Sequence, residues 1–149
     1  MVSPSMVSNK CRYALRAVLE LALRNTTEPV RTPDIAAAQG IPQRFLEIIL
    51  SELKHAGLLR SKRGNNGGYV LARPAHRVTV GQVIECVQGR DSRPPSIGAI
   101  SDSTGDDAFS EMWEKVSEAV SSVYNSITFT DLVEQELAKR NRCVSNYAI

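Results

Sequence analysis

Two segments of the chain have apolar residues at helical spacing, and a short link that contains glycine joins them. Of all the features of the sequence, this pair of helices limits the possible folds most. The first helix is expected over residues 33–38, with Thr32 as its N-cap and a proline and an aspartate in its first turn. The second is expected from Pro42 to Gly57, after the link that contains Gly40. The arrangement is typical of a helix-turn-helix, although proteins that never touch DNA also contain such helix pairs.

The longer helix of the pair is amphipathic, with one apolar side and one polar side. The apolar side is expected to hold Phe45, Leu46, Ile49, Leu50 and Leu53. The polar side is expected to hold Gln43, Arg44, Glu47, Ser51 and Lys54. The polar side is therefore the one available to a partner.

The next segment predicts a β-hairpin, because residues 58–63 and 69–72 have β character and flank a Gly/Asn-rich turn. Its first arm places three cations in four positions, at Arg60, Lys62 and Arg63. Its tip contains glycines, among them Gly67 and Gly68, that allow close approach to a nucleic-acid backbone. A cationic hairpin beside a helix-turn-helix is typical of a wing, whereas the alternative is a solvated hairpin charged for solubility.

The distribution of charge favours a polyanion as the partner of the first half of the chain. Residues 1–77 contain 12 Lys and Arg against 5 Asp and Glu, and residues 78–149 contain 6 against 11. No apolar run approaches the ~18 residues that cross a bilayer, and the first residues lack the apolar region of a secretory signal. We therefore expect a cytoplasmic protein without a membrane partner.

The remainder of the chain predicts a loop followed by a long helix. Residues 88–107 are rich in Gly, Pro, Ser and Asp, which indicates a linker or a mobile loop. After it, apolar residues recur at spacings of 3 and 4, as in a heptad seam: Trp113, Val116, Val120, Val123 and Ile127. The seam favours a homodimer, the alternative being that it covers the chain's own N-terminal domain. A short helix over 131–140, starting at Thr130, is expected to follow.

These patterns divide the chain into five parts. They are a flexible tail (1–8), a winged helix-turn-helix domain (9–88), a linker or sensing loop (89–105), a dimerisation helix with a short C-terminal helix (106–140), and a loose tail (141–149).

The sequence offers little for catalysis or for binding a metal. Cys11, Cys86 and Cys143 are too far apart in the chain for the usual zinc spacing, and no nucleophile motif accompanies the two histidines. We expect no catalytic residues, no metal and no cofactor. Cys86 is the candidate redox thiol, although burial on its helix would leave it unreactive.

Five segments carry a resemblance to a known family: KCRYALRA, GIPQRFLEIILSEL, RGNNGGYVLA, VTVGQVIECV and NSITFTDLV. Over residues 8–136 the sequence strongly resembles the bacterial Rrf family of winged-helix transcriptional regulators, which includes IscR, NsrR and CymR. The resemblance implies a homodimer with two DNA-binding domains and one long dimerisation helix per chain. It also implies that an intracellular signal is sensed between the DNA-binding domain and that helix.

One departure from the family bears on the signal. Cluster-binding members of the family carry three closely spaced cysteines before the dimerisation helix, whereas residues 90–109 here contain none. The aspartates of this segment are hard oxygen ligands and poor substitutes for thiolates around iron and sulfur. We therefore expect no iron–sulfur cluster, and a metal, cluster or thiol redox sensor that uses the dispersed cysteines is the alternative.

The sequence thus predicts a mainly α-helical winged helix-turn-helix regulator, a homodimer that binds double-stranded DNA. The longer helix of the pair should enter the major groove of a palindromic operator, with the wing on the backbone or in the minor groove. The expected DNA contacts, with Arg12 taken from the resemblance, are Arg12, Thr32, Pro42, Gln43, Arg44, Glu47, Arg60, Lys62, Arg63, Gly67 and Gly68. A protein or small-molecule effector is expected at the linker. A winged protein-interaction module without DNA binding is the remaining alternative.

Overall fold

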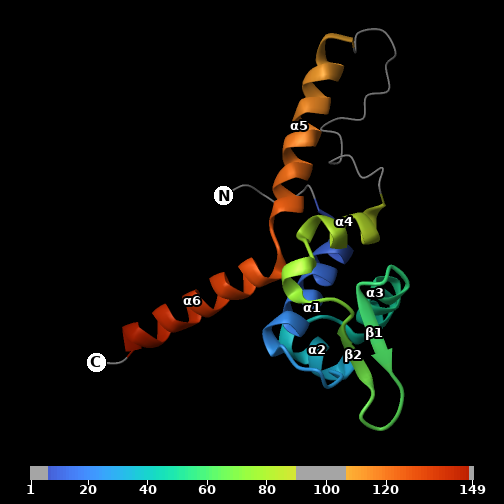
Figure 1. Ribbon diagram of the computed structural model, residues 1–149, viewed down its shortest axis with the longest axis vertical. Coiled ribbons are helices and arrows are strands. Elements are labelled where there is room, and N and C mark those ends of the chain that lie inside the picture. The colour runs from blue at the N-terminus through green and yellow to red at the C-terminus, as the bar shows by residue number, and fades with distance from the viewer. Residues whose placement is uncertain (1–6, 90–106, 148–149) are drawn as a thin grey trace.

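Four helices and one hairpin form an N-terminal head, from which two long helices extend (Figure 1). The computed structural model describes residues 7–89 and 107–147, so most of the predicted linker (89–105) lies outside the described residues. The elements are α1 (Asn9–Arg24), α2 (Thr32–Gln39), α3 (Gln43–His55), β1 (Leu59–Lys62), β2 (Gly68–Leu71), the 3-10 helix η1 (Ala75–Arg77), α4 (Val80–Gln88), α5 (Asp107–Ser126) and α6 (Phe129–Tyr147). The predicted mainly α fold with one two-stranded hairpin is confirmed.

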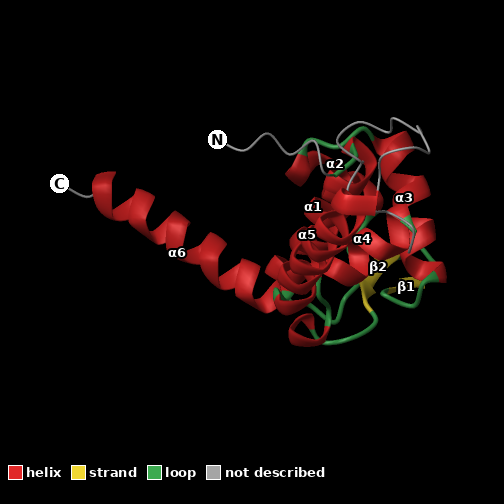
Figure 2. Cartoon of the chain, turned by 90° about the horizontal axis from the view of Figure 1, so that it is seen from above, coloured by secondary structure: helices red, strands yellow, loops and turns green. Residues whose placement is uncertain are grey.

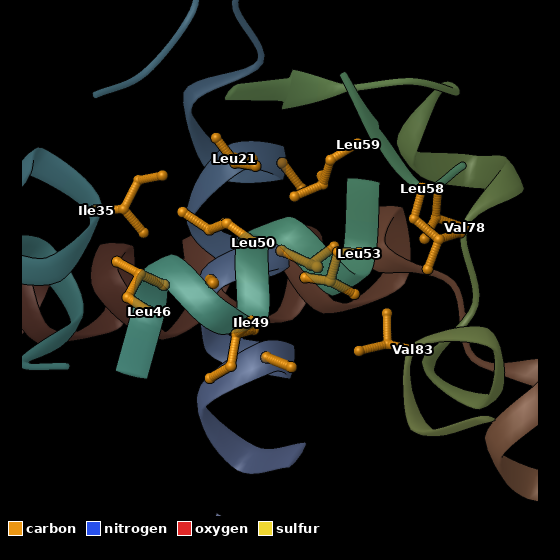
Figure 3. Packing of buried hydrophobic residues seen from close by; sticks show 14 of the residues in the cluster. Leu21, Ile35, Leu46, Ile49, Leu50, Leu53, Leu58, Leu59, Val78 and Val83 are labelled. Carbon is orange, nitrogen blue, oxygen red and sulfur yellow. The ribbon is translucent and has the colours of Figure 1, made fainter. Parts of the chain in front are cut away.

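The core of the head forms where α1, α2 and α3 pack together. The buried side of α3 consists of Leu46, Ile49, Leu50 and Leu53. Figure 3 shows these side chains near Leu21 of α1 and Ile35 of α2. Three buried alanines of α1 allow the neighbouring helices to approach closely, since small side chains shorten the distance between helix axes.

Helices α1 and α2 begin with different kinds of N-terminal cap. Ser8 caps α1, because its Oγ accepts a hydrogen bond from the amide of Cys11 at 3.2 Å. The prediction of Thr32 as the cap of α2 is wrong. The carbonyl of Arg31 accepts bonds from the amides of Asp34 and Ile35 at 3.0 and 3.1 Å, so Arg31 is the cap and Thr32 is the first helical residue.

The segment after α5 returns to the head. The amide of Val80 donates to the carbonyl of Ile127 at 2.9 Å, and the amide of Phe129 donates to the carbonyl of Val78 at 3.0 Å. The side chain of Phe129 is fully buried in the core of the head. Both long helices are therefore fixed to the head at the residues that join them.

The C-terminal helix differs from its prediction at both ends. It begins at Phe129, because Thr128 and Asp131 exchange hydrogen bonds between side chain and amide at 3.0 and 3.2 Å and cap it there. It continues to Tyr147, so the predicted end at residue 140 and the predicted loose tail are wrong as far as residue 147. No glycine or proline interrupts residues 129–147, which explains the longer helix.

The two long helices leave the head in different directions (Figures 1 and 2). Helix α5 rises at the end of the molecule opposite the hairpin, and α6 projects sideways away from the head. Among the described residues, no helix combines the length and the apolar character that a membrane span requires.

Replacing Phe129 with alanine should strongly destabilise the head, because the substitution leaves a cavity in a fully buried position. We expect a loss of about 3–5 kcal/mol in the free energy of unfolding, measured by urea titration followed by circular dichroism. Leu137→Ala, at an exposed position of the same helix, is the control and should change stability by less than about 1 kcal/mol. Equal stability of the two variants would contradict this account of the junction.

Candidate nucleic-acid interface

The turn between α2 and α3 sets the angle between the two helices. Gly40 adopts a left-handed conformation with φ of 61°, which ends α2 and which other residues adopt only with strain. The amide of Ile41 then donates to the carbonyl of Ala36 at 3.0 Å, and the Ile41 side chain is buried. The predicted helix-turn-helix geometry is thus held by one glycine and one apolar contact.

A buried carboxylate holds this turn against α1. Glu20 is only 8% exposed, and its two oxygens accept hydrogen bonds from Arg24 Nε and from Gln39 Nε2, both at 2.8 Å. Arg16 adds contacts to the side chain and the carbonyl of Gln39. The sequence pattern does not predict this network, although a glutamate among the apolar positions of a helix is a signal for it.

Replacing Glu20 with alanine should destabilise the protein, because it leaves the amide of Gln39 and the guanidinium of Arg24 without their acceptor. The expected loss is about 1–3 kcal/mol in the free energy of unfolding, the usual range for hydrogen bonds that involve a charged group. Thermal and urea unfolding measure it, with the exposed Glu28→Ala as the matched control. A Glu20→Ala chain as stable as the control would show that the network contributes nothing.

The N-terminal half of α3 presents polar side chains to solvent. Pro42, Gln43, Arg44 and Glu47 are all exposed, as the sequence predicted for this side of the helix. The side-chain amide of Gln43 donates to Glu47 Oε1 at 3.3 Å, so these two groups form a pair on the surface. Pro42 occupies the N-cap position and offers no side-chain oxygen, which leaves the first amides of α3 without a side-chain cap.

Phe45 does not belong to the buried side of α3, so its predicted place there is wrong. Its side chain is 59% exposed, whereas Leu46 beside it is fully buried. The reason is geometric: Phe45 lies in the first turn, at the edge of the stripe formed by Leu46, Ile49 and Leu53. Ile48, which the sequence analysis did not single out, is 55% exposed.

The hairpin has a core side and a cationic side. Leu59 pairs with Leu71 and Ser61 with Tyr69, and the side chains of Tyr69 and Leu71 pack against the core. Because side chains alternate along a strand, Arg60 and Lys62 lie on the opposite side, away from the core. Both are exposed, as is Arg63 directly after the strand.

Gly67 and Gly68 have a packing role that the sequence analysis did not anticipate. A Cβ on Gly68 would lie 2.2 Å from the carbonyl oxygen of Val30, and one on Gly67 would lie 2.4 Å from that of Lys62. The close approach of Gly68 to Val30 arises because Val30 and Tyr69 exchange two backbone hydrogen bonds of 2.9 Å. Gly68 thus allows the hairpin to pair with the segment before α2, which positions the wing next to the helix-turn-helix, whereas Gly67 allows the turn of the hairpin itself to close.

The remaining predicted contacts lie on α1 and α2. Arg12 is exposed in the first turn of α1, and Thr32 is half-buried at the start of α2. An ion pair of 2.6 Å between Lys10 Nζ and Glu52 Oε1 ties the start of α1 to α3.

The three thiols occupy different environments. Cys11 is buried between α1 and α4, where desolvation, together with the nearby Cys86, raises its pKa to about 11. Burial and then the charge of Glu52 raise the pKa of Cys86, whose Sγ lies 3.7 Å from the carbonyl oxygen of Glu52. Cys143 is exposed on α6. Raised pKa values disfavour the thiolate, which is the form that binds metals and reacts with oxidants.

The described part of the chain does not bring the three thiols together. Within residues 7–89 and 107–147, no group of three or more His, Cys, Asp or Glu side chains is placed to hold a metal ion. The segment 90–106, where an effector is also predicted to act, lies outside the described residues and contains no cysteine in its sequence.

The heptad seam of α5 is exposed to solvent over most of its length. Trp113 is 43% and Val123 is 55% exposed, Val116 is exposed as well, and Val120 is half-buried. The prediction that Ile127 belongs to the seam is wrong, because this residue follows the end of α5 and packs against the head. Exposed Phe109 and Met112 extend the apolar surface toward the start of the helix.

The helix pair with its glycine turn, followed by a cationic hairpin packed against it, defines a winged helix-turn-helix, a class of DNA-binding domain. Comparison with known proteins identifies the family. Residues 7–135 match the Rrf2 family, described as iron-dependent transcriptional regulators, and the chain belongs to this family.

Individual relatives agree with this assignment. The chain is 36% identical over 131 residues to the helix-turn-helix transcriptional regulator IscR of Yersinia enterocolitica, covering 87% of this chain and 80% of IscR. Among solved structures, CymR, the global cysteine regulator of B. subtilis, is 32% identical with a TM-score of 0.73, covering 91% of this chain and 98% of CymR. IscR of T. potens is 32% identical with a TM-score of 0.71, covering 87% of each chain. This protein is a DNA-binding transcriptional regulator.

Proposed function

We propose that the chain acts as a homodimer, in which α3 of each protomer enters the major groove of one half-site of a palindromic operator. The wing lies on the adjacent backbone or in the minor groove. The observation that carries this proposal is the exposed, polar start of α3 next to a hairpin whose cations face away from the core. Recognition helices contact base edges with their first turns, and cations beside them bind phosphates.

The side chains of α3 suit base edges in the major groove. The carboxylate of Glu47 can accept from the amino group of cytosine, and the amide of Gln43 can pair with adenine. Arg44 can reach guanine or a phosphate. Because Gln43 and Glu47 are hydrogen-bonded to each other, each holds the other in position before DNA binds.

Salt should weaken binding steeply, because Arg60, Lys62 and Arg63 displace counterions from phosphates. Arg63→Ala should lower affinity for most sequences and reduce the slope of log K against log salt by about 1. Fluorescence anisotropy with labelled duplexes measures both quantities, with Lys139→Ala on α6 as the control. Binding that does not depend on salt, or an Arg63→Ala chain equal to the parent, would remove the wing from the interface.

Glu47→Ala should act differently, because a base contact affects specificity more than overall affinity. We expect preference at one base pair of each half-site to relax, with discrimination falling by about 1–3 kcal/mol at that position. Selection from a random DNA pool with parent and variant, followed by sequencing, measures it. Unchanged selected sites would show that Glu47 contacts no base.

The partner proposed for the seam of α5 is the same helix of a second copy. Trp113, Val116 and Val123 expose apolar surface along one line of a helix that stands clear of the hairpin. Burying such a seam against a two-fold related copy removes apolar surface from water on both chains at once. Two heads held in this way match two half-sites about 34–36 Å apart or a multiple of that distance.

Val120→Glu should break the dimer, because two buried carboxylates would face each other across the two-fold axis. Light scattering coupled to size-exclusion chromatography should show the mass of one chain or a misfolded product. Ser122→Glu introduces the same charge at an exposed position away from the seam and should leave the dimer intact. A dimeric Val120→Glu chain of unchanged stability would place the interface elsewhere.

We also propose that DNA binding requires no iron–sulfur cluster, since Cys11 is buried, Cys86 is half-buried and Cys143 is isolated on α6. Protein purified without oxygen should contain iron and sulfide far below one equivalent per chain and should still bind selected DNA. A Cys86→Ser chain should bind equally well. Near-stoichiometric iron and sulfide that this substitution removes would overturn the proposal.

A further inference from the structure

Phe45 and Ile48 leave an apolar patch on the surface of α3 that the fold does not use. Both side chains are more than half exposed, whereas the other large apolar side chains of the helix, Leu46, Ile49, Leu50 and Leu53, are buried. Exposing an isoleucine and a phenylalanine three residues apart contributes nothing to the core. Any group that covers the patch therefore lies outside the described part of the chain.

Its position on the helix indicates which side the occupant approaches from. The buried residues of α3 point toward α1 and α2 (Figure 3). With 3.6 residues per turn, Ile48 lies roughly opposite the centre of that buried stripe, one turn after Arg44 on the same line. Phe45 adjoins Ile48 at the i,i+3 spacing. The patch is thus continuous with the polar residues proposed to contact bases.

The chemistry of the major groove supplies an apolar group that fits. Among the groups that base edges present there, the C5 methyl of thymine is the apolar one, and the others donate or accept hydrogen bonds. Charged Arg44 and Glu47 border the patch, so an apolar partner surface would leave their charges without solvent or partners. A DNA groove offers phosphates and base edges to these charges and methyl groups to the patch.

We propose that Phe45 and Ile48 contact thymine methyl groups and so specify at least one thymine in each half-site. This inference rests on the proposed placement of α3 in the major groove. It assigns part of the sequence preference to apolar contacts, beyond the hydrogen bonds of Gln43, Arg44 and Glu47.

The test replaces thymine by deoxyuridine, which removes the methyl group and leaves the base pair unchanged. Duplexes selected from a random pool by the parent chain are synthesised with each thymine replaced singly, and their dissociation constants are measured by anisotropy. Deoxyuridine should weaken binding about fourfold at one or two positions of each half-site, the effect of one buried methyl group. Changes below about 1.5-fold at every thymine would overturn the proposal.

Substitutions in the protein assign the methyl contact to its residues. Ile48→Ser and Phe45→Ala should bind the thymine duplex more weakly and lose the difference between thymine and deoxyuridine at one position each. Both residues are exposed, so the variants should fold, which circular dichroism checks. Ile48→Val keeps branched methyl groups and should keep the difference, as should Val144→Ala on the exposed side of α6.

The outcomes separate this inference from the proposed function. If the parent chain enriches no sequence from the pool, the proposed mode of DNA binding fails. If it enriches a palindrome whose thymines tolerate deoxyuridine, or if Ile48→Ser and Phe45→Ala both keep full methyl sensitivity, only the thymine contact fails.

Discussion

Burial of Phe129 in the head is the contact on which the arrangement of the whole chain depends. The residue follows α5 and begins α6, yet its side chain belongs to the same core as α1 and α3. Backbone hydrogen bonds from Val80 to Ile127 and from Phe129 to Val78 fix the chain on both sides of it. The residues that join α5 to α6 are therefore held in the core of the head, and both long helices start from a fixed point.

A second set of contacts fixes α3 within the head. The alanines of α1 let α3 pack closely, and Glu20 joins α1 to the end of α2 through Gln39. A buried charge of this kind adds little net stability compared with an apolar side chain. It does, however, restrict how the helices can be arranged, because its hydrogen-bond partners must stay in place. The network therefore defines the position of the turn, and through it the direction in which α3 projects from the surface.

The sequence predicted the features that local patterns determine. The glycine of the turn and the hairpin around its Gly/Asn turn both follow short-range rules, and the structure contains each of them. Side chains whose environment depends on distant segments were harder to predict. Glu20 needs Gln39, and Gly68 needs the carbonyl of Val30, so neither role is visible within its own helix or strand.

The same distinction explains the errors at the ends of elements and on their faces. Phe45 follows the helical period closely enough to suggest burial, but no other element reaches the edge of the first turn of α3 to cover it. Ile127 continues the 3-and-4 spacing of the seam although α5 has already ended at Ser126. In both cases the helical spacing of the apolar residues was read correctly. The errors arose because the neighbouring element, or the helix itself, ended before it reached the residue. The sequence pattern was enough to predict that the residues proposed for DNA contact and for the dimer lie on the surface. It could not identify what these residues bind, because their partners are other molecules.

The junction between α4 and α5 links the two surfaces proposed for binding. A Cβ on Gly81 would lie 1.9 Å from Oδ1 of Asn125, so α4 and the end of α5 meet closely at this glycine. The bridge between Thr79 and Thr128 lies beside this contact, so the base of α5 is attached to the head at more than one point. In a two-fold symmetric dimer held along α5, a change in the crossing angle of the two seams would therefore turn both heads together. In the proposed dimer, the spacing and orientation of the two α3 helices would depend on the angle at which the two seams cross, because each α5 is attached to its own head at this junction.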